Sequence, residues 1–185
     1  MKMMIASDLH GSAYYTAKIK EIFEEERPDR LILLGDLLYH GPRNPLPRDY
    51  APMETAEILN SMKDSILAVR GNCDSEVDQV VLDFPIGADY MVWYDQGSMI
   101  FTTHGHLFHG KKRPHLGRRD ILLQGHTHIP VIESRGRFVR LNPGSAALPK
   151  EGFEPSCMIY EDGVFEIRTL EGRTMMSYDL AAGEF

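Results

Sequence analysis

The sequence predicts an α/β protein in which two sheets pack face to face and helices lie outside them. Its first half alternates short apolar runs with helical patterns, and this alternation implies parallel strand pairing. Its second half contains pairs of strand-like runs around short turns, which is typical of hairpins. With 185 residues, 43% of them hydrophobic, the chain can bury a sizeable core, so we expect one domain over residues 1–185.

The first half is expected to run strand, helix, strand, helix, strand. Residues 3–7 form a short apolar run, and Ser12 can cap a helix over residues 13–26 that Pro28 ends. The run 31–34 is a second buried strand, and a proline-rich loop over residues 39–50 follows it. A helix from Pro52 to about residue 63 then leads to a third strand over residues 66–69.

The second half is expected to consist of hairpins and one further strand. Residues 90–94 and 98–103 flank the turn Asp95-Gln96-Gly97, and the run 121–124 forms a separate strand. The remaining strands are 131–133 and 138–141 around Gly136, 158–160 and 164–168 around Asp162-Gly163, and an edge strand over 175–180.

Composition narrows the class of protein. A formal net charge of −7 argues against a general nucleic-acid binder, which is normally basic. Two cysteines cannot build a disulfide framework, and neither a secretory segment nor a membrane-spanning apolar run is evident. We therefore expect a cytoplasmic protein with no membrane partner. The basic stretch Lys111-Lys112-Arg113, with Arg118 and Arg119, is either a solvated loop or a surface that attracts substrate.

Potential metal ligands follow the strand-like runs, and their order is the most informative feature of the chain. Strand ends in an α/β sheet point to a common crevice, so residues far apart in sequence can meet there. Carboxylate, imidazole and amide ligands together suit two divalent cations held side by side, and such pairs of cations are used in phosphate-ester hydrolysis. The seven candidates are Asp8, His10, Asp36, Asn72, His104, His126 and His128.

The first candidates also have simpler explanations. Asp8 and His10 are two residues apart at a strand end, so both can face one ion, but they could instead be a helix cap and a surface imidazole. Asp36 ends a strongly apolar strand, and its two carboxylate oxygens make it the best candidate to bridge two ions. Capping a helix is the alternative for Asp36. Asn72 follows Gly71, where an ordinary turn asparagine is common.

The histidines near the middle of the chain come in two clusters. His104-Gly105-His106 and Gly125-His126-Thr127-His128 each follow a strand-like run. Four histidines in two such clusters exceed what packing requires, so we expect His104, His126 and His128 to bind metal. His106 is either an outer contact of the centre, a substrate contact or a loop histidine.

Taken together, these blocks resemble the calcineurin-like metallophosphoesterase superfamily. Its pattern is D-x-H, G-D-x-x-D-R-G, G-N-H-[DE], H-G-H and G-H-x-H, and matching blocks run in this order from Asp8 to His128. The stretches 35–45 and 70–74 resemble its small bacterial phosphodiesterases more closely. The resemblance implies a four-layer α/β/β/α sandwich, with two mixed sheets flanked by helices, around two divalent ions.

The resemblance also implies a role for each residue. Asp36 would bridge the ions, and a hydroxide between them would attack phosphorus opposite the leaving oxygen. Manganese is the metal that the family implies, although iron, zinc, nickel and cobalt accept the same ligands. Asn72, His104 and His106 would act at the reacting phosphate. One ion would take Asp8, His10, Asp36 and His128, and the other Asp36, Asn72, His104 and His126.

The chain departs from the family pattern at the position of its acid. Cys73 and Tyr39 stand where the family often has a histidine and the carboxylate that orients it, and His40 replaces the arginine. A thiol with a pKa of about 8.5 is a poor substitute acid at neutral pH. We therefore expect a preference for aryl phosphodiesters, whose leaving group needs little protonation.

Further expectations concern substrate and partners. Arg43 and Cys73 are candidate substrate contacts, although Arg43 could equally lie in a subunit contact of the proline-rich loop. That loop and the resemblance also indicate a homo-oligomer. The leading function is a metal-dependent phosphodiesterase acting on a small molecule. The alternatives are a protein-interaction scaffold of the same fold, which the complete ligand set disfavours, and a nuclease, which the acidic charge disfavours.

Overall fold

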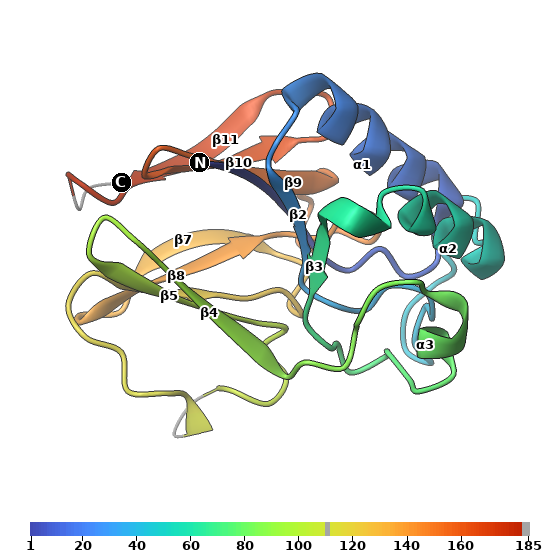
Figure 1. Ribbon diagram of the computed structural model, residues 1–185, viewed down its shortest axis with the longest axis horizontal. Coiled ribbons are helices and arrows are strands. Elements are labelled where there is room, and N and C mark those ends of the chain that lie inside the picture. Colours follow the sequence, from blue (N-terminus) through green and yellow to red (C-terminus); the bar gives the residue numbers. More distant parts are fainter. Residues whose placement is uncertain (110–111, 183–185) are drawn as a thin grey trace.

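The computed structural model describes residues 1–109 and 112–182, so Lys111 of the basic stretch lies outside the described residues. Two mixed sheets face each other, and helices α1 (Ala13–Glu26) and α2 (Pro52–Asn60) cover the outer side of the larger sheet (Figure 1). The fold class expected from the sequence is therefore confirmed. No helix within the described ranges has the length and apolar character to cross a membrane.

The larger sheet has six strands in the order β11-β10-β9-β1-β2-β3. β1 pairs parallel with β2 and β2 with β3, as the strand–helix alternation predicts, whereas β9, β10 and β11 extend the sheet antiparallel. The edge strand expected near the end of the chain is present as β11. The strands are β1 (Lys2–Ala6), β2 (Arg30–Leu33), β3 (Ile66–Ala68), β9 (Ser156–Glu161), β10 (Val164–Thr169) and β11 (Thr174–Asp179).

The smaller sheet has five strands in the order β4-β5-β6-β8-β7. Its outer pairs β4–β5 and β7–β8 are the expected antiparallel hairpins, and β6 lies parallel to both β5 and β8. The strands are β4 (Tyr90–Asp95), β5 (Ser98–Thr103), β6 (Asp120–Leu123), β7 (Pro130–Ser134) and β8 (Phe138–Pro143).

The helices follow local signals of different strength. The Ser12 side chain accepts a hydrogen bond from the backbone N–H of Tyr15, and this cap begins α1 where the sequence predicts it. α2 ends at Asn60, earlier than expected, and a short 3₁₀ helix (Lys63–Ser65) follows it. α3 (Asp78–Val81) was not expected, because four residues are too few to show a helical period.

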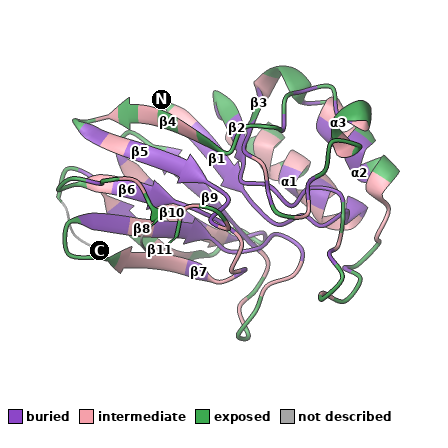
Figure 2. Ribbon diagram, turned by 90° about the horizontal axis from the view of Figure 1, so that it is seen from below, coloured by how far each residue is buried: buried purple, intermediate pink, exposed green. Residues whose placement is uncertain are grey.

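The core is layered in the same way as the fold. Along β2, Leu31 and Leu33 pack toward the helices, whereas Ile32 packs against the other sheet, as strand alternation requires. A smaller cluster that includes Phe101 and Phe138 lies on the outer face of the five-stranded sheet. Figure 2 shows the buried stretches of β5, β6 and β8 in purple.

The loops after the parallel strands of both sheets lie against one another. Backbone hydrogen bonds join Asp8 N to Gly35 O at 3.1 Å and Gly125 N to His104 O at 3.0 Å. The backbone N–H of His126, from the smaller sheet, donates to Asp8 Oδ2, from the larger one, at 3.1 Å. The fold therefore brings the candidate ligands to one shared edge.

Candidate metal centre

The candidate ligands lie in loops, and five of the seven adopt a left-handed backbone conformation. Non-glycine residues rarely have positive φ, and each costs on the order of 1 kcal/mol, so a cluster of them is typical of a functional site. Because β1 ends at Ala6, the explanation that Asp8 and His10 share one face of a strand is wrong. The φ values are 57° for Asp8, 47° for His10, 57° for Asp36, 67° for His126 and 62° for His128.

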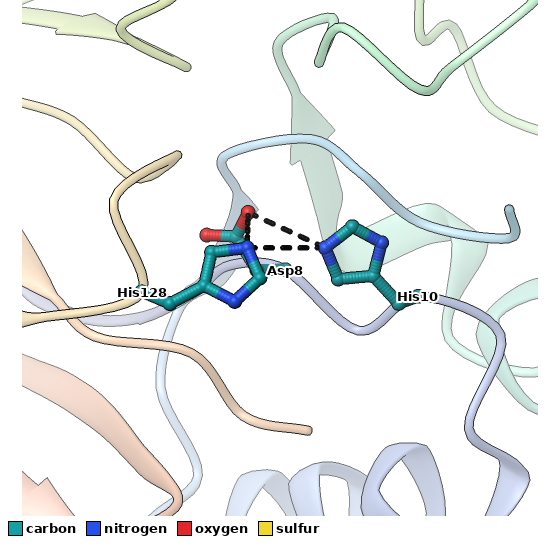
Figure 3. A group of neighbouring side chains, drawn as sticks. All are labelled: Asp8, His10 and His128. Carbon is teal, nitrogen blue, oxygen red and sulfur yellow. Dashed lines mark hydrogen bonds and ion pairs between the residues drawn. The ribbon is translucent and has the colours of Figure 1, made fainter. Parts of the chain in front are cut away.

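Asp8, His10 and His128 form the first ligand group (Figure 3). His10 Nε2 lies 3.2 Å from His128 Nε2, which in turn lies 3.3 Å from Asp8 Oδ1. Asp36 Oδ2 completes the group at 3.7 Å from His10 Nε2. Neighbouring ligands of one metal ion are separated by about 3.0–3.4 Å when the metal–ligand bonds are near 2.1 Å. The His10–His128 and His128–Asp8 distances match this spacing, and the distances from His10 Nε2 to Asp36 Oδ2 and Asp8 Oδ1, 3.7 and 3.8 Å, are somewhat wider.

Asn72, His104 and His126 form the second ligand group, on the other oxygen of Asp36. His104 Nε2 lies 3.1 Å from Asn72 Oδ1 and 3.2 Å from His126 Nδ1. The same Nε2 lies 3.5 Å from Asp36 Oδ1. All seven residues are thus brought together, and Asp36 turns one carboxylate oxygen toward each group.

Backbone carbonyls orient three of the imidazoles by accepting a hydrogen bond from Nδ1. With its proton on Nδ1, a neutral imidazole presents a lone pair at Nε2. His10 and His128 therefore face each other with two lone pairs, an arrangement that a cation between them would stabilise. The acceptors are Tyr39 O at 2.8 Å from His10, Leu34 O at 2.7 Å from His104 and Leu148 O at 2.6 Å from His128.

Asp8 has one satisfied and one unsatisfied carboxylate oxygen. Oδ2 accepts hydrogen bonds from Ser7 Oγ at 2.6 Å and from the backbone N–H of His126 at 3.1 Å. Oδ1 is buried and has no hydrogen-bond partner among the described residues. A buried carboxylate oxygen without a donor is costly unless a cation faces it. The donor set and this oxygen therefore fit divalent metal ions.

The charged neighbours and the burial of each ligand shift the pKa values within the two groups. Burial opposes ionisation of Asp8, but the nearby imidazoles of His128 and His104 outweigh burial and lower the pKa of Asp8. Burial disfavours the charged form of His104 too, yet Asp36 and Asp8 raise its pKa to about 9. In His10 burial prevails and lowers the pKa, which keeps this ring neutral as metal binding requires.

Asp74 fixes the backbone around Asp36, the candidate bridging residue, and the sequence interpretation missed this role. Its Oδ2 accepts hydrogen bonds from the backbone N–H groups of Asp36 at 2.8 Å and Gly71 at 2.7 Å. Its Oδ1 accepts one from the backbone N–H of Leu37 at 2.7 Å. Burial raises the pKa of Asp74 to about 6. The acidic position of the family pattern G-N-H-[DE] is the signal that could have identified it.

Gly71 allows the loop after β3 to approach Asp36 closely. A Cβ at this position would lie 2.2 Å from Asp36 Oδ1 and 2.3 Å from the backbone N of Asp36. No side chain fits there without displacing the carboxylate. The backbone N–H of Cys73 donates to the same Oδ1 at 2.8 Å, so the loop both contacts and orients the bridging oxygen.

The Cys73 side chain lies beside the first group. Its Sγ and the ligand atoms of His10 and Asp36 lie within 4.8 Å of one another. Burial, followed by the charge of Asp36, raises the pKa of the Cys73 thiol to about 12. A neutral thiol of this kind is neither a nucleophile nor an effective acid at neutral pH.

A cavity of about 420 Å³ lies over both ligand groups and is lined by residues from each. Arg43, which the sequence offers as a candidate substrate contact, is among the residues that line it. Thr127 and Lys150 also line it, and the sequence interpretation missed both. The backbone N–H of Lys150 donates to His128 O at 3.2 Å, and this contact places the lysine near the centre. No sequence motif indicates the position of Lys150.

His106 lies beside the second group and outside the residues that line the cavity. Its ring centroid is 5.3 Å from that of His104 and 6.3 Å from that of His126. Its Nδ1 is buried without a hydrogen-bond partner among the described residues. The structure therefore places His106 near the centre but not in the ligand groups.

Known proteins resemble this chain in both sequence and fold. Phosphodiesterase YfcE of Escherichia coli (strain K12) is 44% identical over 177 residues, which cover 96% of each chain. The solved structure of YfcE, a phosphoesterase from E. coli, has a TM-score of 0.93 at 42% identity and covers 97% of this chain and 100% of its own. Both findings agree with the resemblance to small bacterial phosphodiesterases noted from the sequence.

More distant relatives extend the comparison. The probable metallophosphoesterase YsnB of Bacillus subtilis (strain 168) is 28% identical over 100% of this chain and 94% of its own. Vps29 of Entamoeba histolytica, solved with Zn²⁺, shares the fold with a TM-score of 0.64 at 21% identity, covering 97% of this chain and 99% of its own. The family model of the calcineurin-like phosphoesterase superfamily domain matches residues 1–162. The chain therefore belongs to the calcineurin-like phosphoesterase superfamily.

Proposed function

We propose that the protein is a phosphodiesterase that works with two divalent ions bridged by Asp36. The observation that carries this proposal is the arrangement of the two ligand groups on opposite oxygens of one carboxylate. The facing lone pairs of His10 and His128 and the unpartnered Asp8 Oδ1 support it, because each fits a cation. The 44% identity to YfcE supports a phosphodiester as the substrate class.

The chain's own residues bind and orient the substrate in this proposal. When bound, the two ions would supply a nucleophile at neutral pH and stabilise negative charge on the phosphoryl oxygens. Arg43 and Lys150 line the cavity over the ligands, where their positive charges attract and orient a phosphodiester. Asn72 and His104 belong to the second ligand group and would bind the second ion. The ring of His106 packs against that of His104 and so keeps it in position.

Cys73 determines which leaving groups the site can expel in this proposal. It occupies the position at which the family often has a histidine acid, and its thiol stays neutral because its pKa is about 12. A poor acid favours leaving groups that are stable as anions. We therefore propose aryl phosphodiesters as the best synthetic substrates and Mn²⁺ as the most effective metal, with Fe, Zn, Ni and Co as alternatives.

A substrate panel on metal-stripped protein tests the proposal. The panel compares an aryl diester, an aryl monoester and cyclic nucleotides, with each metal added back separately. Activity is expected only after metal is added, and the aryl diester is expected to react fastest. Asp36→Asn should abolish activity, whereas Asp83→Asn, at an exposed residue that pairs with Lys63, should not. Full activity of Asp36→Asn, or of protein shown by elemental analysis to be metal-free, would contradict the proposal.

We also propose self-association through the proline-rich loop and a cytoplasmic location. Leu46 in this loop is 62% exposed, which favours a contact with another copy. Both cysteines are free thiols, as expected in a reducing compartment. Light scattering coupled to gel filtration should give a mass above the monomer, and Leu46→Asp should lower it. An unchanged mass for this variant would exclude the loop as the contact.

A further inference from the structure

The outer face of the smaller sheet carries an arginine-lined basin. The basin consists of two cavities of about 550 and 350 Å³, which share Arg113, Arg135 and Phe138 as lining residues. Arg140 lines the larger cavity and Arg137 the smaller one. We call these four arginines with Phe138 the arginine basin. Among the residues that the structure describes, none lines both the basin and the cavity over the metal ligands.

Two segments of the chain build the arginine basin, namely residues 135–140 and the segment that carries Arg113. Phe138 and Arg140 are two apart on β8 and therefore project from the same face of the sheet. Arg135 and Arg137 flank Gly136 in the turn between β7 and β8. Arg113 comes from the segment between β5 and β6, far from the others in sequence. Tertiary structure therefore adds Arg113 to three arginines that lie close together in sequence between residues 135 and 140.

The positive charge of the basin is poorly compensated. No acidic side chain is among the described residues that line either cavity. Glu133 is the one carboxylate that pairs with the basin among the described residues, at 2.8 Å from both Arg135 and Arg140. Since the whole chain has a net charge of −7, this concentration of four arginines contrasts with the rest of the protein. An anion is therefore the expected occupant.

Contacts within and beside the basin fix the guanidinium groups of two of its arginines. The guanidinium of Arg113 lies over the Phe138 ring, with Cζ 4.6 Å from the ring centroid, which is the geometry of a cation–π contact. Arg140 is anchored by Glu133, yet its Nε is buried without a hydrogen-bond partner in the described structure. An anchored guanidinium group can form two parallel hydrogen bonds to a phosphate, and it loses less conformational entropy in doing so than a free one.

We propose that the arginine basin binds a small organic anion that carries at least two phosphate groups, such as a nucleoside polyphosphate. Four guanidinium groups spread over two cavities that share three lining residues can contact more than one phosphate at the same time. The larger cavity, about 550 Å³, has the volume of a typical small-molecule site, and Phe138 gives it an apolar floor. Because the basin and the metal cavity share no lining residue within the described ranges, this ligand would bind at a site separate from that of the reacting phosphodiester.

Calorimetric titration with two probes, ATP and inorganic tripolyphosphate, tests this proposal at about 0.15 M salt. The full-length protein is titrated as purified and again after chelation, because chelation removes any binding through metal ions. One site per chain with the same affinity in both states is the expected result. Binding that disappears on chelation, the absence of saturable binding, or equal competition by sulfate would each overturn the proposal.

Paired variants locate the site. Arg113→Ala combined with Arg137→Ala should weaken binding of tripolyphosphate by about tenfold or more, because two of the four guanidinium groups are lost. Arg30→Ala combined with Arg173→Ala makes the same change in net charge at exposed residues outside the basin, and should leave binding unchanged. Both double variants should retain activity on the aryl diester, which reports an intact fold. Equal losses of binding in the two would overturn the assignment.

Discussion

Replacement of Asp74 by asparagine tests how the bridging carboxylate is held. The Asp74 carboxylate accepts three backbone hydrogen bonds, from Asp36, Leu37 and Gly71, and thereby joins the loops after β2 and β3. The substitution keeps the size of the side chain and replaces one acceptor oxygen with a donor. Any effect therefore comes from hydrogen bonding and charge rather than from packing.

The expected loss of stability follows from these three bonds. The asparagine oxygen can keep the bonds to Asp36 and Gly71, but its amide nitrogen then faces the N–H of Leu37. An unpaired buried donor costs about 1–3 kcal/mol. The weaker bonds to a neutral acceptor are offset because the substitution also relieves the burial penalty on the Asp74 charge, the penalty that raises the pKa of this carboxyl. We therefore expect Asp74→Asn to lower the free energy of unfolding by about 1–3 kcal/mol.

Chemical denaturation of metal-free protein measures this loss. A carboxyl group with a pKa of about 6 is ionised at about pH 8, so the comparison is made there. Asp78→Asn is the matched control, because the carboxylate of Asp78, at a half-buried position, accepts one backbone hydrogen bond, from Ser75. It should cost about 1 kcal/mol or less. If Asp74→Asn stayed within about 1 kcal/mol of wild type and bound metal equally well, the proposed positioning role would be refuted.

Other predictions concern the loop after β3 and the histidines. Gly71→Ala should lower kcat/KM on an aryl diester by about tenfold or more, since its Cβ would displace Asp36, whereas Gly87→Ala, with open space around it, should not. Cys73→His should change activity on alkyl esters more than on aryl esters; equal changes would count against the account of Cys73 as a poor acid. Metal binding at about pH 7.5 should release a proton from His104, whose pKa of about 9 in the metal-free protein keeps it charged there. Calorimetry in buffers of different ionisation enthalpy measures this release, and a result independent of the buffer would contradict it.

The fold could be predicted where local signals are strong. Residues 13–26 were assigned correctly because Ser12 caps the helix and Pro28 follows its end. The parallel strands could be inferred because each is an apolar run separated from the next by a helical pattern. α3 was missed because so short a helix has no detectable period.

The candidate site could be predicted from its motifs but not from its geometry. Asp8 and His10 do meet, although through left-handed turns rather than strand alternation, and positive φ at such residues leaves no mark in the sequence. Lys150 reaches the cavity only through tertiary contacts, so no local pattern marks it, whereas Thr127 lies inside the Gly125–His128 block and follows its two histidines to the cavity. Arg113 joins Arg135 and Arg140 through tertiary contacts as well, and its basic neighbours suggested either a solvated loop or a surface that attracts substrate.

Anomalous diffraction from crystals soaked in Mn²⁺ tests the central claim most directly, because it locates each ion independently of activity. Two peaks about 3.5–4 Å apart are expected, one on each side of Asp36. One should contact Asp8, His10 and His128, and the other Asn72, His104 and His126. A single peak, or two peaks that do not share Asp36, would contradict the account.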